Sequence, residues 1–105
     1  MCQLFARQDP SNYEFETRSL RIGGHSTSVR LETLFWTILE EMAASEGMSL
    51  GKFITKLSDE VLELYGNAHN FASLLRCSCL IYLRTMPQAV VERDTLALRK
   101  VAPAA

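Results

Sequence analysis

Hydrophobic and polar positions alternate with a period of two along residues 26–31, which is typical of a β-strand with one buried face. The face expected to be buried consists of Thr27, Val29 and Leu31. The opposite face is polar and consists of Ser26, Ser28 and Arg30. Weaker alternation precedes this strand at residues 13–22, before the turn signal Gly23-Gly24. Because a lone strand is not stable in water, residues 26–31 must pair either with that upstream segment or with a second copy of the chain.

The period then changes to that of an amphipathic helix over residues 32–46. Gly47 is the expected C-cap of this helix, and Ser49 is the expected N-cap of a second helix with apolar residues at three- and four-residue steps. A third helix of about four turns is expected after Gly66, ending before Pro87. The chain is therefore expected to be mainly α-helical with a short N-terminal β-ribbon.

These elements divide the chain into four parts. Residues 1–25 form an N-terminal arm that could hold an extra strand, and residues 26–65 form the strand and two helices. Residues 66–85 form the third helix, and residues 86–105 a flexible or partly helical tail.

The composition limits the classes of partner. With 105 residues and 48% hydrophobic content, the chain is expected to form one small domain. A formal net charge of −1 argues against a protein that coats nucleic acid or anionic membranes without selectivity. The charge is nevertheless uneven, because residues 17–31 hold Arg18, Arg21 and Arg30 and no acid. Without an apolar run of about 20 residues, a signal peptide or a disulfide framework, we expect a reduced, cytoplasmic protein outside the membrane.

No pattern in the chain predicts catalysis. Cys77 and Cys79 could ligate a metal together with His25 or His69, but residues two apart on a helix point about 200° apart and chelate poorly. We interpret the two cysteines as small apolar residues. Nucleophilic, phosphate-binding and dinucleotide motifs are missing from the sequence. We expect no enzyme, no metal and no cofactor.

The order of strand, helix, glycine turn and serine-capped helix resembles the ribbon-helix-helix family of bacterial DNA-binding regulators, which includes Arc and MetJ. The spacing of Leu31, Gly47 and Ser49 carries this resemblance over about residues 26–64. The stretches "TRSLRIGGHSTSVRLE", "EGMSLGKFI" and "NFASLLR", together with Trp36, are similar to short bacterial ribbon-helix-helix domain proteins and extend it to about residues 1–85. In the family the strand pairs with the same strand of a second chain. The resemblance therefore implies an intertwined homodimer, here with an extra C-terminal helix.

The resemblance also implies roles for individual residues. A two-stranded ribbon fits the major groove of DNA, and its outward side chains read the bases. The implied base-reading residues are Ser26, Ser28 and Arg30. Together with the local positive charge, the resemblance assigns DNA phosphates to Arg18, Arg21, His25, Ser49, Leu50, Gly51 and Lys52. The implied dimer core consists of Val29, Leu31, Phe35, Ile38, Leu39, Met42, Met48, Phe53, Ile54 and Leu57.

Two functions follow from these expectations. The first is a sequence-specific DNA-binding transcriptional regulator, a repressor or autoregulator, that binds double-stranded DNA as a homodimer or as a dimer of dimers. The second is an antitoxin-like or scaffold module, in which the same dimer uses residues 66–105 to bind a protein partner. The sequence leaves both open.

Overall fold

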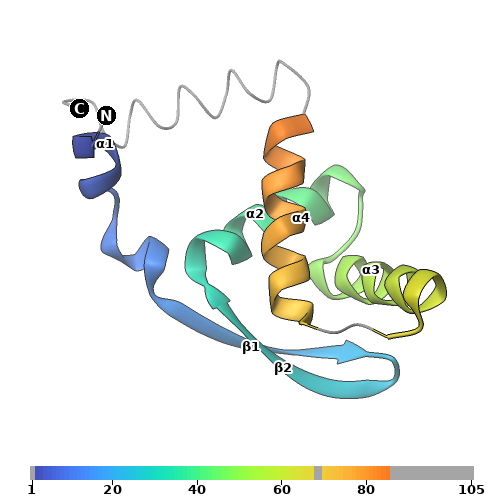
Figure 1. The fold of residues 1–105 in the computed structure, drawn as a ribbon. Helices are drawn as coiled ribbons and strands as arrows, with labels where there is room; N and C mark the ends of the chain where they lie inside the picture. Colours follow the sequence, from blue (N-terminus) through green and yellow to red (C-terminus); the bar gives the residue numbers. More distant parts are fainter. Residues whose placement is uncertain (1, 68–69, 86–105) are drawn as a thin grey trace.

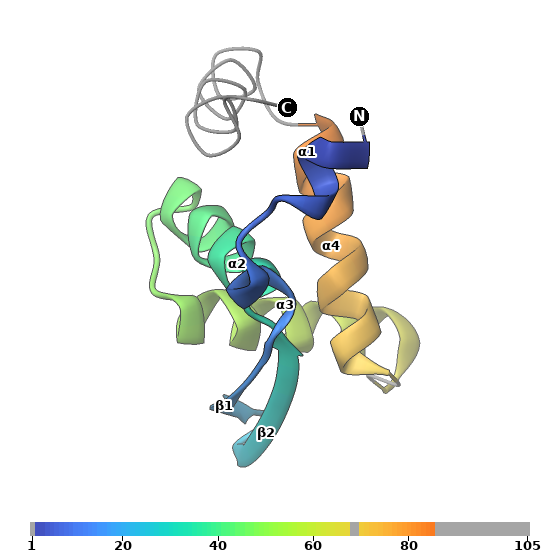
Figure 2. The same ribbon diagram turned by 90° about the vertical axis from the view of Figure 1, so that its left-hand side faces the viewer.

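The structure, a computed structural model, describes residues 2–67 and 70–85 and places a β-hairpin beneath three long helices (Figure 1). The elements in chain order are α1 (Cys2–Ala6), the 3-10 helix η1 (Pro10–Tyr13), β1 (Phe15–Ile22), β2 (His25–Glu32), α2 (Thr33–Ser45), α3 (Leu50–Tyr65) and α4 (Phe71–Thr85). The long helices lie on one face of the hairpin, and in the described part of the chain its other face is left uncovered (Figure 2).

The three expected helices are present, with their expected end signals. The Ser49 hydroxyl accepts a hydrogen bond of 3.3 Å from the backbone N–H of Lys52 and so caps α3. Gly47, with a φ of +69°, follows the last turn of α2. The expected tail at residues 86–105 lies outside the described residues.

The hairpin answers the question of the strand partner. β1 pairs antiparallel with β2 along its whole length, from Phe15 opposite Glu32 to Ile22 opposite His25. The two residues between the strands, Gly23 and Gly24, both have positive φ, +59° and +81°, as a type I′ turn requires. Residues 26–31 therefore have one strand partner within the chain, and pairing of the other edge of β2 with a second copy stays a prediction.

The hydrophobic core lies between the inner face of the hairpin and the helices. Its fully buried side chains are Leu31, Trp36, Leu39, Ile54, Leu75 and Cys79. Six of the ten residues expected in a dimer core are already buried in one chain, namely Val29, Leu31, Ile38, Leu39, Met42 and Ile54. The other four, Phe35, Met48, Phe53 and Leu57, are only partly buried. Because α4 covers the core, a single chain buries apolar surface that the sequence analysis assigned to a partner.

Trp36 joins α2 to β1. Its side chain is 0% exposed, and its Nε1–H donates a hydrogen bond of 2.8 Å to the backbone carbonyl of Glu16. The guanidinium of Arg18 lies over the indole, 4.9 Å from the ring centroid. Trp36 is therefore a packing residue that links α2 to β1.

A second connection joins α4 to the end of β2. Arg76 donates to the carboxylate of Glu32 at 2.9 Å, and both side chains remain about a third exposed. The pKa of Glu32 is lowered, first because its own backbone N–H donates to the carboxylate and then because of Arg76, and these effects outweigh partial burial.

We expect Trp36→Phe to lower the free energy of unfolding by about 1–2 kcal/mol, because it removes the hydrogen bond to the Glu16 carbonyl and leaves space in the core. Urea unfolding followed by circular dichroism measures this loss. Tyr13→Phe, at an exposed aromatic residue, is the matched control and should change the stability by less than about 0.5 kcal/mol. Equal stabilities of wild type and Trp36→Phe would contradict the anchoring role.

We expect Glu32→Gln to destabilise the fold by up to about 1 kcal/mol at pH 7, since the ion pair with Arg76 is partly exposed. The folded pKa of Glu32 is lowered, so its contribution is present above the unfolded pKa of about 4.3 and is lost as the pH falls through the folded value. Urea unfolding at a series of pH values from 7 downward should show the stability difference between wild type and variant shrinking as the pH falls below the unfolded pKa. A difference that does not shrink would assign the effect to something other than the carboxylate charge.

Candidate nucleic-acid interface

The uncovered face of the hairpin is a polar surface built from both strands. In the ladder, Thr17 lies opposite Arg30, Ser19 opposite Ser28, and Arg21 opposite Ser26. All six of these residues are exposed, and we call them the outer face. The structure thus presents the three expected base-reading residues on one surface. β1 adds Thr17 and Ser19, which had no expected role, and Arg21, which was expected to contact a phosphate.

Arg30 is the cation of β2 on the outer face. Its guanidinium lies 4.2 Å from the centroid of the Phe15 ring. Phe15 is itself 52% exposed, so the stacked pair stands at the surface of the sheet.

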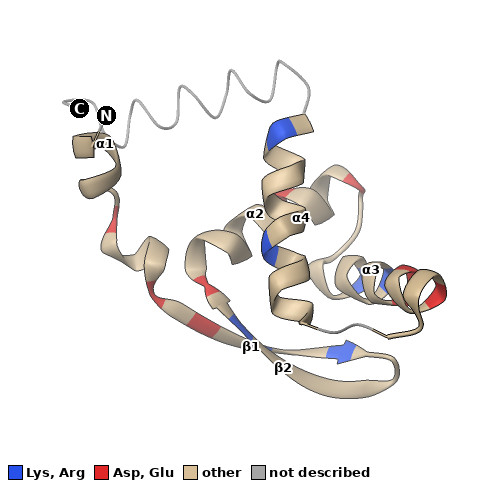
Figure 3. Cartoon of the chain, viewed as in Figure 1, with Lys and Arg blue, Asp and Glu red and all other residues tan. Residues whose placement is uncertain are grey.

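A groove beside the outer face separates β1 from the start of α3. It contains three cations and one acid, and its lining consists of Ser19, Leu20, Arg21, Gly51, Lys52, Thr55, Lys56 and Asp59. The Thr55 hydroxyl donates a hydrogen bond of 2.7 Å to the carbonyl of Arg21, which holds β1 against α3. The basic residues of α3 lie in its first half and the acids in its second, so the groove meets the basic end (Figure 3).

The groove brings together several of the expected phosphate contacts. Arg21, Gly51 and Lys52 line it, and Lys56 joins them. The first N–H groups of a helix lack intrahelical acceptors and carry the positive end of the helix dipole. Ser49 and Leu50 lie at this end of α3. Cations and helix N-terminus together form a surface suited to an anion such as a phosphate.

Arg18 and His25 lie apart from this groove. Arg18 is on the inner side of β1 and forms ion pairs with Glu16 and Glu40. These carboxylates, Glu16 foremost, raise the pKa of the Arg18 guanidinium. Its charge is therefore paired within the chain in this structure, and its expected phosphate contact stays a prediction. His25 is exposed and directly follows the glycine turn.

The β1 side of the interface had only a weak sequence signal. If residues 15–22 are a strand rather than an arm, the alternation of the strand places Phe15, Thr17 and Ser19 on the outward side. The signal was the alternation of residues 13–22 ending in a two-residue Gly-Gly loop, which is typical of a tight hairpin.

The cysteines lie on different sides of α4. Cys77 is exposed and Cys79 is buried, and burial raises the pKa of the Cys79 thiol to about 11. Within residues 2–67 and 70–85, no three His, Cys, Asp or Glu side chains gather closely enough to hold a metal ion. No helix in the same ranges combines the length and apolar character needed to cross a membrane.

Comparisons with known proteins agree with this architecture. None of the curated proteins matches the chain. A solved structure of an uncharacterized protein from Bordetella pertussis Tohama I is 41% identical, with a TM-score of 0.79, and the match covers 100% of this chain and 89% of that one. The family profile described as "Ribbon-helix-helix domain" matches residues 15–83, which include the hairpin, α2, α3 and most of α4. The chain therefore belongs to the ribbon-helix-helix domain family.

Proposed function

We propose that the protein is a sequence-specific DNA-binding transcriptional regulator, a repressor or autoregulator, that acts as a homodimer. Domains of this family generally bind DNA as regulators, antitoxins among them. The observation that carries the proposal is the outer face, a helix-free polar surface with two exposed arginines, flanked by the basic groove at the start of α3. In the proposed complex the outer face meets base edges, and the groove meets a phosphate.

Among the described residues β2 pairs with β1 alone, and its other edge supports a dimer built through the sheet. In a hairpin with a two-residue loop, alternate residues direct their backbone groups to the partner strand or away from it. The hydrogen bond of 2.8 Å from the Thr33 N–H to the Glu14 carbonyl continues the ladder of bonds between the two strands. By alternation, the backbone N–H and C=O groups of Ser26, Ser28 and Arg30 point away from β1, toward the outer edge of β2. The outer edge of β1 is occupied at the Arg21 carbonyl, to which α3 donates. A second copy is therefore expected to add at β2, in the order β1-β2-β2-β1.

A four-stranded sheet is wider than the major groove, so we expect its central and outer strands to contact different parts of the DNA. Neighbouring strands lie about 4.8 Å apart, and the major groove is about 12 Å wide. The two central β2 strands fit this width, whereas the β1 strands would lie over its rims. Ser26, Ser28 and Arg30 are then the base readers, and Arg21 joins Lys52 as a phosphate contact.

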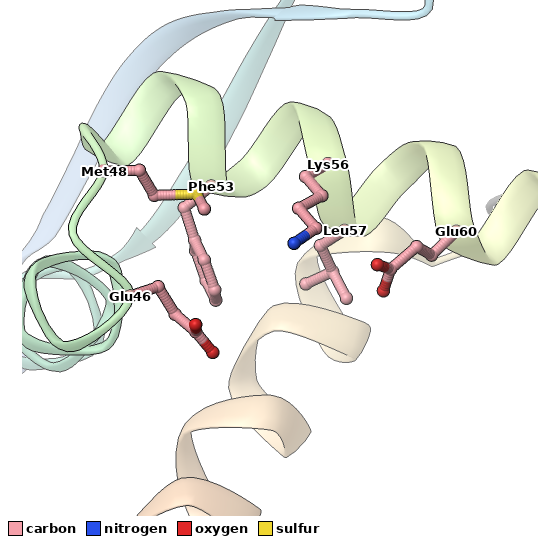
Figure 4. Close-up of a pocket in the computed structure, with 6 residues that line it drawn as sticks. All are labelled: Glu46, Met48, Phe53, Lys56, Leu57 and Glu60. Carbon is pink, nitrogen blue, oxygen red and sulfur yellow. The ribbon is translucent and has the colours of Figure 1, made fainter.

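A hollow beside α3 also supports a dimer. Its lining combines three partly buried apolar side chains, Met48, Phe53 and Leu57, with Glu46, Lys56 and Glu60 (Figure 4). The apolar three stand at the positions that the resemblance assigns to the dimer core. They point into one open space of about 100 Å³, which an apolar side chain of a second copy would fill.

Random-site selection with the full chain, followed by fluorescence anisotropy on the selected and a scrambled site, tests DNA reading. We expect Arg30→Ala to weaken binding to the selected site by about 1–3 kcal/mol and to change binding to the scrambled site little. Lys52→Ala and Arg21→Ala should weaken both sites equally and reduce the salt dependence, because they remove phosphate contacts.

The selection itself can refute the proposal. If no sequence is enriched above the non-specific level, the protein is not a sequence-specific reader. If Arg21→Ala instead relaxes the sequence preference, then β1 enters the major groove of the DNA. The proposed placement of the β1 strands over the rims of that groove is then wrong.

We expect Met48→Lys to raise the dissociation constant of the dimer by about tenfold or more, because it places a charge in the hollow without removing a residue of the single-chain core. Sedimentation equilibrium measures this change. Leu64→Lys is the matched control, since Leu64 is 73% exposed on α3 and lies outside the hollow. A dimer that Met48→Lys leaves intact would place the interface elsewhere.

The exposed apolar side chains Leu80 and Ile81 on α4 favour the second candidate function, a module that binds a protein partner through residues 66–105. Arg30→Glu separates the two functions. Charge reversal on the outer face abolishes DNA binding by a ribbon reader, whereas an antitoxin-like or scaffold module that only dimerises keeps both its dimer and its partner.

A further inference from the structure

Phe15, which alternates with Thr17 onto the same side of β1, forms a stacked pair with Arg30 of the outer face. Thr17 is the direct ladder partner of Arg30, and Phe15 lies diagonally across from Arg30, within reach of a long side chain. The guanidinium lies 4.2 Å from the ring centroid, the shortest of the three arginine–aromatic contacts in the described residues.

The first of the other two contacts shows what a structural arginine does in this fold. Arg18 lies 4.9 Å from the Trp36 ring centroid, and it also donates to the carboxylates of Glu16 and Glu40. The face of the guanidinium is held by an aromatic ring, and its edge is held by acids.

Arg76 repeats this arrangement with Phe35, at 5.9 Å, and Glu32. Arg30 departs from it. None of the ion pairs among the described residues involves Arg30, although its face is held by Phe15. Its N–H donors therefore remain available at the surface.

The neighbouring acid is kept occupied. Glu32 lies two positions after Arg30 on β2, where a free carboxylate could take the guanidinium. Its oxygen instead accepts from Arg76 on α4 at 2.9 Å. The Arg30 edge thus stays open because α4 holds the acid nearest to it along the strand.

We propose that Phe15 is a positioning residue that sets the sequence preference of Arg30. The ring holds the guanidinium flat and directs its parallel N–H donors toward a planar pair of acceptors, such as O6 and N7 of guanine. This inference rests on the proposed function, because it requires that the outer face reads DNA.

Stacking on Phe15 strengthens DNA binding because the Arg30 side chain is already ordered before the complex forms. A free arginine loses side-chain freedom when it is fixed on a base, and this loss weakens the complex. Stacking on Phe15 fixes much of that freedom in the unbound protein. A phosphate, which accepts hydrogen bonds from many directions, gains less from this order than a base edge does, so the effect concentrates on the specific site.

A double-mutant cycle on the full chain tests the inference, with the selected and scrambled DNA sites as probes. We expect Phe15→Leu, which keeps an apolar residue but removes the flat ring, to weaken the selected site by about three- to tenfold and to leave the scrambled site unchanged. Phe15→Tyr should restore wild-type affinity. In the Arg30→Ala background, Phe15→Leu should have no effect. Tyr13→Leu, at an exposed aromatic residue outside the ladder, is the matched control and should have none in either background.

Each other outcome overturns a defined part of this account. If Arg30→Ala lowers specific affinity but Phe15→Leu does not, the positioning role is wrong and the proposed function stands. If Phe15→Leu has the same effect with and without Arg30, then Phe15 contacts DNA itself. If Phe15→Leu weakens both sites equally, the ring supports the sheet rather than the arginine. If Arg30→Ala changes neither site, the proposed reading face fails, and the inference fails with it.

Discussion

The burial of Trp36 against the inner face of the hairpin is the contact on which the relation between sheet and helices depends. Trp36 is in the first turn of α2, directly after β2, and its indole N–H reaches across to the Glu16 carbonyl of β1. A single side chain of α2, the helix that follows the hairpin, is therefore bonded to β1, the first strand of the hairpin. With this contact fixed, β1 also lies against α3, where Thr55 donates to Arg21. The outer face and the basic groove then keep a constant relative position, which a surface that must match DNA requires.

The helices could be predicted from the sequence because their signals are local. A glycine with positive φ after α2 and a serine that caps α3 determine two helix ends, and the apolar spacing determines the faces. The alternation of residues 26–31 likewise predicted which side chains face outward. The polar set Ser26, Ser28 and Arg30 is exposed, and Val29 and Leu31 are buried. Thr27 was expected on the buried face but is exposed, so this part of the prediction was wrong.

The pairing of that strand could not be decided from its own pattern. β1 is only half-buried, with Glu16 and Arg18 at inner positions, so its hydrophobic alternation is weak. These two charges are tolerated there because they pair with each other and because Arg18 packs on Trp36. The same pairing engages Arg18 within the chain, which no count of charges along the sequence could reveal. The role of α4 was also hidden, since covering the core with Leu75 and Cys79 depends on long-range packing.

The glycine turn also affects the order in which the chain acquires its structure during synthesis. Hairpins closed by such short loops form within about 1–10 μs, so β1 and β2 can pair as soon as both have left the ribosome. The core residue Leu75 of α4 follows the end of β2 at Glu32 by 43 positions (75 − 32). At a translation rate of about 5–20 residues per second, the hairpin waits roughly 2–9 s for that helix. During this interval its apolar side lacks the cover that α4 provides, so the apolar surface of the hairpin stays exposed until α4 has been synthesised.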